Sequence, residues 1–152
     1  MILLAYRHGL RAAELVDLRW DQVNLQAANL HVRRLKNGVP STHPLTGSEL
    51  RALRRLQREA PRGATPFVFV SERGAPFTTS GFAKLLERVA ETAKLTTLKV
   101  HPHMLRHACG FKLANDGVDT RSLQAYLGHR SIQHTVRYSE LAPDRFKKFW
   151  KD

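Results

Sequence analysis

Cysteine, acidic residues and long apolar runs are all scarce in this sequence of 152 residues. The one cysteine, Cys109, excludes an internal disulfide and any zinc site that needs several cysteines. No apolar run is long enough to cross a bilayer, and no signal peptide is recognisable. These absences favour a cytoplasmic protein in which Cys109 is a small core residue rather than a nucleophile.

The charge balance is one-sided. Lysine and arginine number 25 against 13 aspartate and glutamate residues, which gives a formal net charge of +12. This excess predicts an acidic partner, with nucleic acid as the first candidate and an anionic membrane surface as the second. A merely basic soluble protein is the plain alternative. Hydrophobic residues make up 42% of the chain, which argues against disorder and suffices for one domain with a core.

The chain shows no internal repeat, low-complexity segment or interdomain linker, so we expect residues 1–152 to form a single domain. Its first eight residues have the pattern of the end of an apolar helix, with no cap before it. We therefore expect that the N-terminal helix is truncated, or its start misplaced, and that upstream residues are missing.

Periodicity and turn signals predict a mainly helical α+β domain with a small antiparallel sheet at one edge. A strand at residues 29–34 precedes Lys36-Asn-Gly38, a strong hairpin signal, and residues 39–43 return as an edge strand. Residues 67–70 are expected to form a short buried strand. Helices are expected at residues 11–18, 46–59, 102–115, 120–127 and 131–138, and from residues 78 and 143 onward.

Three clusters of chemically active residues lie far apart in the chain. They are His8-Gly-Leu-Arg11-Ala-Ala-Glu14, His101-Pro-His-Met-Leu-Arg-His107, and the stretch from Leu127 to Tyr138 with its Gly-His pair. Together they supply a phenol, arginines and histidines, which suits chemistry on an anion. We interpret them as parts of an enzyme that cuts and rejoins DNA with Tyr138 as its nucleophile.

Attack on a phosphodiester gathers negative charge on the non-bridging oxygens. Arg11 and Arg106 each offer a planar fork of donors that stays charged at all working pH values. A free tyrosine phenol has a pKa of about 10, so Tyr138 needs neighbouring cations and a base, for which His103 is placed. Lys36 on the hairpin is suited to protonate the leaving 5′ oxygen. None of these steps requires a metal or another cofactor.

Plainer or rival uses remain open for several residues. A metal site would use His101, His103, His107, His129 and His134. Against it, Arg106 repels a cation and no acidic residue accompanies these histidines until Asp116. Purely structural hydrogen bonding is expected for His31, His43 and His134. Taken alone, Arg11 and Glu14 are an ordinary surface ion pair worth under ~1 kcal/mol.

The ordered set of motifs resembles the catalytic domain of the tyrosine recombinases, the phage-integrase family. The matching pieces are His8-Gly-Leu-Arg11-Ala-Ala-Glu14-Leu15, His103-Met-Leu-Arg106-His107, Leu127-Gly-His129 and Tyr138. Their order and separations agree with that family over nearly the whole chain. Within it, Arg33-Arg-Leu-Lys-Asn-Gly38 and His134-Thr-Val-Arg-Tyr138 are most similar to the short fimbrial phase-variation recombinases of bacteria.

The resemblance implies a role for each matching residue. The catalytic side chains would be Arg11, Lys36, His103, Arg106, His129 and Tyr138. The arginines would bind the scissile phosphate, the lysine would be the general acid, the first histidine would assist as base, and the second would bond to the phosphate. Glu14 would support Arg11. The tyrosine would form a 3′-phosphotyrosyl link that conserves bond energy, so no ATP is needed.

The resemblance also implies a partner and an assembly. Family members typically act on double-stranded DNA as tetramers, which implies a homotetramer on DNA and a monomer or dimer alone. An apolar stripe of Phe146, Phe149 and Trp150 is the candidate for docking onto a neighbouring subunit, and packing on its own domain is the alternative. In one respect we expect a departure from the family, because these 152 residues do not contain the N-terminal helical domain that clamps DNA in most members.

Three functions stay open at this point. The first is a site-specific recombinase, with DNA inversion as its specific form. The second is a type IB topoisomerase-like enzyme that uses similar groups to relax supercoils. The third is a non-catalytic DNA-binding relic.

Overall fold

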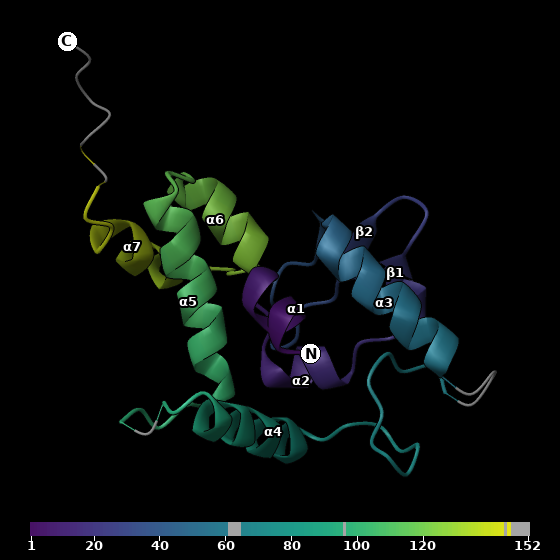
Figure 1. The fold of residues 1–152 in the computed structure, drawn as a ribbon. Coiled ribbons are helices and arrows are strands. Elements are labelled where there is room, and N and C mark those ends of the chain that lie inside the picture. Colours follow the sequence, from purple (N-terminus) through teal and green to yellow (C-terminus); the bar gives the residue numbers. More distant parts are fainter. Residues whose placement is uncertain (61–64, 96, 145, 147–152) are drawn as a thin grey trace.

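Seven α-helices and a three-stranded sheet make up the fold of the computed structural model, which describes residues 1–60, 65–95, 97–144 and 146 (Figure 1). The N-terminal part contains α1 (Ile2–Arg7), α2 (Ala12–Val16), a 3₁₀ turn (Trp20–Gln22), β1 (Val23–Asn24), β2 (Asn29–Val32), β3 (Ser41–Pro44) and α3 (Gly47–Glu59). The remainder contains α4 (Thr79–Thr92), α5 (Pro102–Asn115), α6 (Thr120–Leu127) and α7 (Gln133–Glu140). The predicted mainly helical α+β fold is confirmed. In the described ranges, every helix is too short or too polar to cross a membrane.

The sheet is antiparallel with the order β1–β2–β3, and β2 and β3 pair with Leu30 opposite His43. This pairing confirms the predicted hairpin, whereas the two-residue β1 was not predicted. The predicted strand at residues 67–70 was wrong, because these residues make isolated bridges to Arg19 and Pro76 instead of joining the sheet. Their apolar character reflects burial in the core, which a strand and a packed loop share.

The turn between β2 and β3 carries Lys36 and packs against the end of α6. Lys36 and Asn37 have positive φ angles of 53° and 60°, and the Gly38 amide donates to the Leu35 carbonyl at 3.2 Å. The central turn residues are thus Lys36 and Asn37, one position before the Asn-Gly pair that the sequence favoured. Gly38 is needed just after the turn, since a Cβ there would lie 3.0 Å from the Gly128 carbonyl oxygen.

Local capping signals set most helix ends. α3 begins with a capping box in which the Thr46 amide donates to Glu49 Oε2 at 2.8 Å. α5 has Pro102 in its first turn, and α6 ends at Gly128 in the left-handed conformation, with φ 68°. These helices agree with the predicted ranges to within one residue. α2 is only five residues long: it begins one residue later than predicted, because Arg11 has extended backbone and is its N-cap, and it ends at Val16 with Asp17 as its C-cap.

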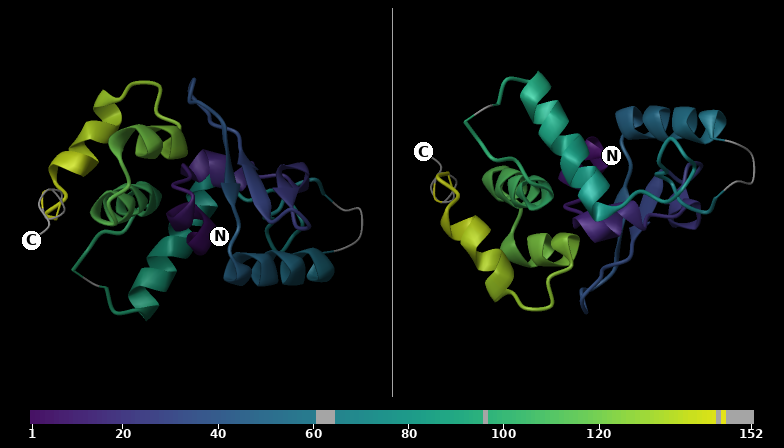
Figure 2. Two further views of the ribbon diagram at one scale, coloured as in Figure 1. Left: turned by 90° about the horizontal axis from the view of Figure 1, so that it is seen from above. Right: turned by 90° about the horizontal axis from the view of Figure 1, so that it is seen from below.

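Two apolar cores meet where α1 packs against α5. The first core takes its buried side chains from α1 to α4 and the sheet, and the second takes its own from α5, α6 and α7. Figure 2 shows α1 beside α5, with the sheet and α3 on one side and α6 and α7 on the other. Cys109 is buried in the second core, as predicted. The junction brings the N-terminal motif to the two C-terminal motifs.

A buried histidine pair lies at this junction. His8 Nδ1 is 3.0 Å from His43 Nδ1, and His8 Nε2 is 3.0 Å from Glu49 Oε1. The Tyr126 ring stacks on His43 with centroids 3.8 Å apart. Since a neutral His8 that donates from Nε2 to the carboxylate must accept at Nδ1, His43 donates from its own Nδ1. The predicted structural role of His43 is confirmed, and His8 shares it.

We expect the stability of the fold to decrease as the pH falls below about 6.5. Burial lowers the pKa of His8 and lowers that of His43 to about 3. In the unfolded chain both take up a proton at about pH 6.5. The unfolded state therefore holds more protons below that pH and is favoured there, while above it the full stability is present. Unfolding temperatures at pH 7.5 and pH 5 measure this loss of stability, and His43→Gln should reduce the difference between the two temperatures. An unchanged difference in the variant would contradict the explanation.

Candidate active site

A cavity of about 460 Å³ opens between the β2–β3 turn, the start of α5 and the loop after α6. It brings together five of the six predicted catalytic residues: Arg11, Lys36, His103, Arg106 and His129. The rest of its lining is Asn37, Gly38, Gly128, Arg130, Ser131, His134 and Arg137. Among the described residues that line it there is no acidic side chain, while five are lysine or arginine. The cavity is therefore suited to an anion of high charge density.

Glu14 holds Arg11 at the cavity. Its carboxylate is buried and accepts from the Arg11 amide at 2.9 Å and from Arg11 Nη1 at 2.8 Å. It also accepts from Arg34 Nη1 at 2.9 Å and from the Leu35 amide at 3.2 Å. Burial raises the pKa of Glu14, but the hydrogen bonds from Arg11 and the charge of Arg34 outweigh it, so the pKa lies below its ordinary value. The pair is thus part of a buried network and differs from an ordinary surface ion pair.

Arg34 is the buried residue of this network that the sequence analysis missed. Its side chain is 0% exposed, and its guanidinium also donates to the carbonyl oxygens of Gly9 at 3.2 Å and Tyr126 at 2.6 Å. It therefore ties the end of β2 to the α1–α2 connection and to α6. A signal was available, since Leu30, Val32 and Arg34 alternate along the strand and all three are buried.

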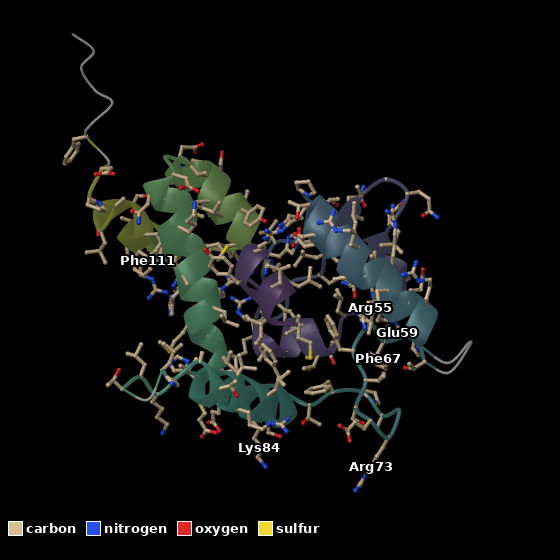
Figure 3. All side chains as sticks on the ribbon, in the orientation of Figure 1. Arg55, Glu59, Phe67, Arg73, Lys84 and Phe111 are labelled. Atoms are coloured by element: carbon tan, nitrogen blue, oxygen red, sulfur yellow. The ribbon has the colours of Figure 1, made fainter. Side chains whose placement is uncertain are left out.

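We expect Glu14→Gln to destabilise the fold by about 3–5 kcal/mol, because it leaves the buried Arg34 guanidinium without its carboxylate. Thermal or denaturant unfolding measures the effect. The matched control is Glu59→Gln, which removes an exposed ion pair with Arg55 on α3 (Figure 3). That control should lower the free energy of unfolding only slightly, because both of its side chains are exposed to solvent. Similar losses in the two variants would show that the network around Glu14 is not stabilising in this way.

Arg106 is held between the two cores by backbone carbonyls. It is 1% exposed, and its Nη2 donates to the Leu127 carbonyl oxygen at 2.8 Å. Its Nη1 donates to the Gly9 carbonyl oxygen, which Arg34 also contacts. Burial, followed by the charges of Arg34 and Arg11, lowers the pKa of Arg106 to about 10, so it is still charged at neutral pH. Its acceptors are neutral carbonyls, and its positive charge is therefore available to an anion in the cavity.

His129 and His103 line the cavity as neutral imidazoles. Burial, then the charges of Arg106 and Arg11, lowers the pKa of His129 to about 3. His129 Nδ1 lies 2.8 Å from Thr135 Oγ1, which leaves Nε2 for a ligand. Burial is also the largest cause of the lowered pKa of His103. Both rings can therefore donate one hydrogen bond and accept another at neutral pH.

Tyr138 lies behind the cavity wall rather than in it. It is 1% exposed, its ring is parallel to that of His129, and the ring of Phe111 on α5 meets it edge-on with the centroids 5.0 Å apart. Its hydroxyl lies 2.8 Å from His107 Nδ1 and 3.2 Å from Arg137 Nη2. Arg137 itself lines the cavity. The structure thus places the phenol next to the cavity, with its hydroxyl on a histidine other than the one predicted to be the base.

The remaining histidines make local contacts. His31 Nδ1 is 3.2 Å from Thr42 Oγ1, as expected for a structural hydrogen bond. The rings of His103 and His107 meet edge-on at 4.4 Å, and those of His129 and His134 lie 5.9 Å apart. Within the described parts of the chain, no three His, Cys, Asp or Glu side chains are grouped to hold a metal ion.

Comparison with known sequences shows to which family this chain belongs. Residues 1–145 match the profile of the Phage integrase family. The chain belongs to that family. It is 44% identical over 155 residues to the type 1 fimbriae regulatory protein FimE of Escherichia coli K12, covering 99% of this chain and 78% of FimE. The predicted resemblance to the tyrosine recombinases, and to the fimbrial type within the phage integrase family, is confirmed.

Solved structures of this family share the fold. XerA recombinase matches with a TM-score of 0.80 and 26% identity, covering 96% of this chain and 54% of XerA. XerH recombinase, solved in a post-cleavage complex with its palindromic difH substrate, matches with a TM-score of 0.79 and 22% identity, covering 97% of this chain and 43% of XerH. The chain thus spans about half the length of each of these two recombinases.

Proposed function

We propose that this chain is a site-specific DNA recombinase that cuts and rejoins DNA through a covalent link to Tyr138. The observation that carries the proposal is the cavity: it gathers five lysine or arginine side chains and lies directly beside a buried phenol. Membership in the phage integrase family supports the same reaction.

The arginines would stabilise the charge that develops on the phosphate. Arg106 is pinned by backbone carbonyls and Arg11 by Glu14, so both donors are in place before DNA arrives. Such preorganised charge is worth most in a cavity that excludes water, because no reorganisation is needed during the reaction. His129 would donate from Nε2 to a phosphate oxygen while Thr135 holds its Nδ1.

Cleavage also needs proton transfers. Lys36 stands at the tip of the β2–β3 turn, in a positive-φ conformation that non-glycine residues seldom adopt and that is concentrated at functional sites. It would give a proton to the leaving 5′ oxygen, and His103 would assist proton transfer at the phosphate. The products are a 3′-phosphotyrosyl link and a free 5′ hydroxyl, and the reverse attack reseals the strand without ATP, metal or other cofactor.

Double-stranded DNA is the proposed partner, and inversion the proposed outcome because of the similarity to the fimbrial protein FimE. We further propose a homotetramer on DNA, and a monomer or dimer alone. The apolar C-terminal stripe is the proposed docking segment. Phe146 is 60% exposed, whereas Phe149 and Trp150 lie outside the described residues.

A suicide substrate tests the proposal directly. A pool of short duplexes with random flanking sequence is nicked near the cleavage position, so that cleavage releases a fragment and traps the enzyme on the DNA. We expect a covalent adduct that survives denaturation and maps to Tyr138, and sequencing of the trapped DNA gives the target site. Absence of an adduct from the pool would favour a non-catalytic DNA-binding relic. Relaxation of supercoiled plasmids without any defined site would favour a topoisomerase.

A further inference from the structure

We propose that His107 is the base that takes the phenolic proton from Tyr138, and that Arg137 stabilises the resulting phenolate. The sequence motifs predict His103 as the base for that step and assign His107 no role in the reaction. This inference rests on the proposed function, because it assigns one proton transfer of the same cleavage reaction.

The hydrogen bonds around the hydroxyl determine which atom accepts. Tyr138 Oη lies 2.8 Å from His107 Nδ1, within the range required of a general base. Arg137 Nη2 lies 3.2 Å from that same Nδ1 and 3.2 Å from Oη. A guanidinium has donors only, so the Nδ1 atom facing it must be unprotonated and accept. His107 is therefore neutral with its proton on Nε2, and the phenol donates its own proton to Nδ1.

The surrounding charges favour this protonation state. The titratable and charged groups that face His107 come from α5, its N-cap and α7: His101, His103, Arg106, Arg137 and Tyr138. Burial, followed by the charges of Arg137 and Arg106, lowers the pKa of His107, so the ring is a free base at neutral pH. The Arg137 guanidinium also lies 5.0 Å from the centre of the Tyr138 ring, so a positive charge faces the phenol.

Packing holds the phenol against His107. A Cβ added to Gly110 would lie 2.8 Å from Tyr138 Cζ, so the glycine lets the ring lie directly on α5. His107 and Gly110 are three residues apart on that helix and therefore share a face. Arg137 is exposed and lines the cavity. Arg137 therefore connects the buried phenol with the cavity, because its guanidinium has further donors for a DNA phosphate while Nη2 stays at Oη.

Cleavage and resealing each transfer two protons and exchange one bond to phosphorus for another. The Tyr138 O–H bond breaks and its proton passes to His107 Nδ1, while Oη forms a bond to phosphorus and the bond from phosphorus to the 5′ oxygen breaks. The leaving oxygen takes a proton from Lys36. On resealing, the 5′ hydroxyl gives its proton back to Lys36 and its oxygen attacks phosphorus, the bond from phosphorus to Oη breaks, and His107 returns the proton to Oη.

His107→Asn separates proton transfer from positioning. Its side-chain amide can keep a hydrogen bond near the place of Nδ1, but it cannot take up a proton. We expect its single-turnover cleavage of the trapping duplex to slow by about 10²-fold. We also expect the wild-type rate to fall as the pH drops through the lowered pKa of His107, and His107→Asn to lose that dependence. Wild-type rate and pH dependence in the variant would overturn the proposal, and so would faster cleavage, which would mean that His107 restrains the phenol.

Two comparisons assign the effect to the base rather than to the acid or to His103. With sulfur in place of the bridging 5′ oxygen, the leaving group needs no proton, so Lys36→Ala should recover its rate while His107→Asn stays slow. Recovery of His107→Asn on this substrate would contradict the proposal. His103→Asn should cleave slowly, but its cleavage rate should still decrease as the pH falls. Loss of that pH dependence would indicate that His103 is the base.

Nitrogen NMR of the wild-type protein tests the assignment without any variant. With ¹⁵N-labelled histidine at pH 7.5, we expect His107 Nδ1 to have the shift of an unprotonated ring nitrogen. A protonated Nδ1 would overturn the proposal. The two proposals fail on different results. Lack of an adduct at Tyr138 in the wild type would contradict the proposed function. A normal adduct together with wild-type cleavage rates in the His107 variants would contradict only the role of His107 as the base.

Discussion

Replacing Tyr138 with phenylalanine is expected to abolish the covalent protein–DNA adduct and to leave DNA affinity nearly unchanged. The substitution removes the attacking oxygen, while the ring keeps its contacts with His129 and Phe111. The lost hydrogen bond to His107 should cost folding only about 1 kcal/mol. The cations that attract phosphate all remain. Denaturing electrophoresis with the nicked duplex measures the adduct, and a gel-shift titration measures the affinity.

The same chemical change at a second tyrosine provides the control. The Tyr126 hydroxyl is also part-buried and donates to the Arg7 carbonyl oxygen at 2.8 Å, but Tyr126 does not line the cavity. Tyr126→Phe should therefore form adduct like the wild type. Parallel loss of adduct and of DNA binding in Tyr138→Phe would count against a nucleophile, because it would indicate general damage to the binding surface.

Replacing Arg106 with alanine is expected to slow cleavage by about 10²- to 10³-fold, the usual cost of one preorganised donor to a developing oxyanion. The variant also leaves the carbonyl oxygens of Gly9 and Leu127 without this donor. The Gly9 oxygen keeps its hydrogen bond from Arg34, whereas loss of the donor to the Leu127 oxygen should cost about 1–3 kcal/mol, so the unfolding temperature should fall as well. Single-turnover rates are therefore to be measured well below that temperature, where the variant is folded.

Two further variants separate geometry from charge. Arg106→Lys keeps the positive charge but loses the planar fork, and should still be well below wild-type rate. Arg73→Ala removes an exposed arginine that lies away from the cavity, near the foot of the view in Figure 3, and should cleave normally. A near-normal rate for Arg106→Ala would contradict the proposed phosphate role.

Most elements could be predicted because their signals are local. The capping box at Thr46, the first-turn Pro102 and the left-handed Gly128 mark helix ends through backbone hydrogen bonds within a few residues. The errors lie where local signals are ambiguous. Residues 67–70 have the composition of a buried strand but make only isolated bridges, and α2 lies between its caps Arg11 and Asp17 instead of continuing to Leu18.

In the candidate site, too, local patterns predicted some features and contacts between elements decided the others. Five of the six side chains that the motifs predicted line one cavity, including Arg11 and Arg106, whereas Tyr138 lies behind its wall. Burial of Arg34, however, follows from the meeting of β2 with α1 and α6, which the sequence analysis did not anticipate. The partner of the Tyr138 hydroxyl was likewise missed. His103 and His107 are four residues apart on one helix face, so spacing alone cannot say which of them meets α7.

By itself, the amino-acid sequence determined the helical periodicity, the hairpin, the strong positive charge and the set of residue types able to act on a phosphodiester. Only the tertiary structure decided which donors are pinned by carbonyls, which arginine is buried, and which histidine touches the phenol. The physical reason is that local hydrogen bonding sets an element and its faces, whereas contacts between elements depend on how whole helices pack across the junction of the two cores.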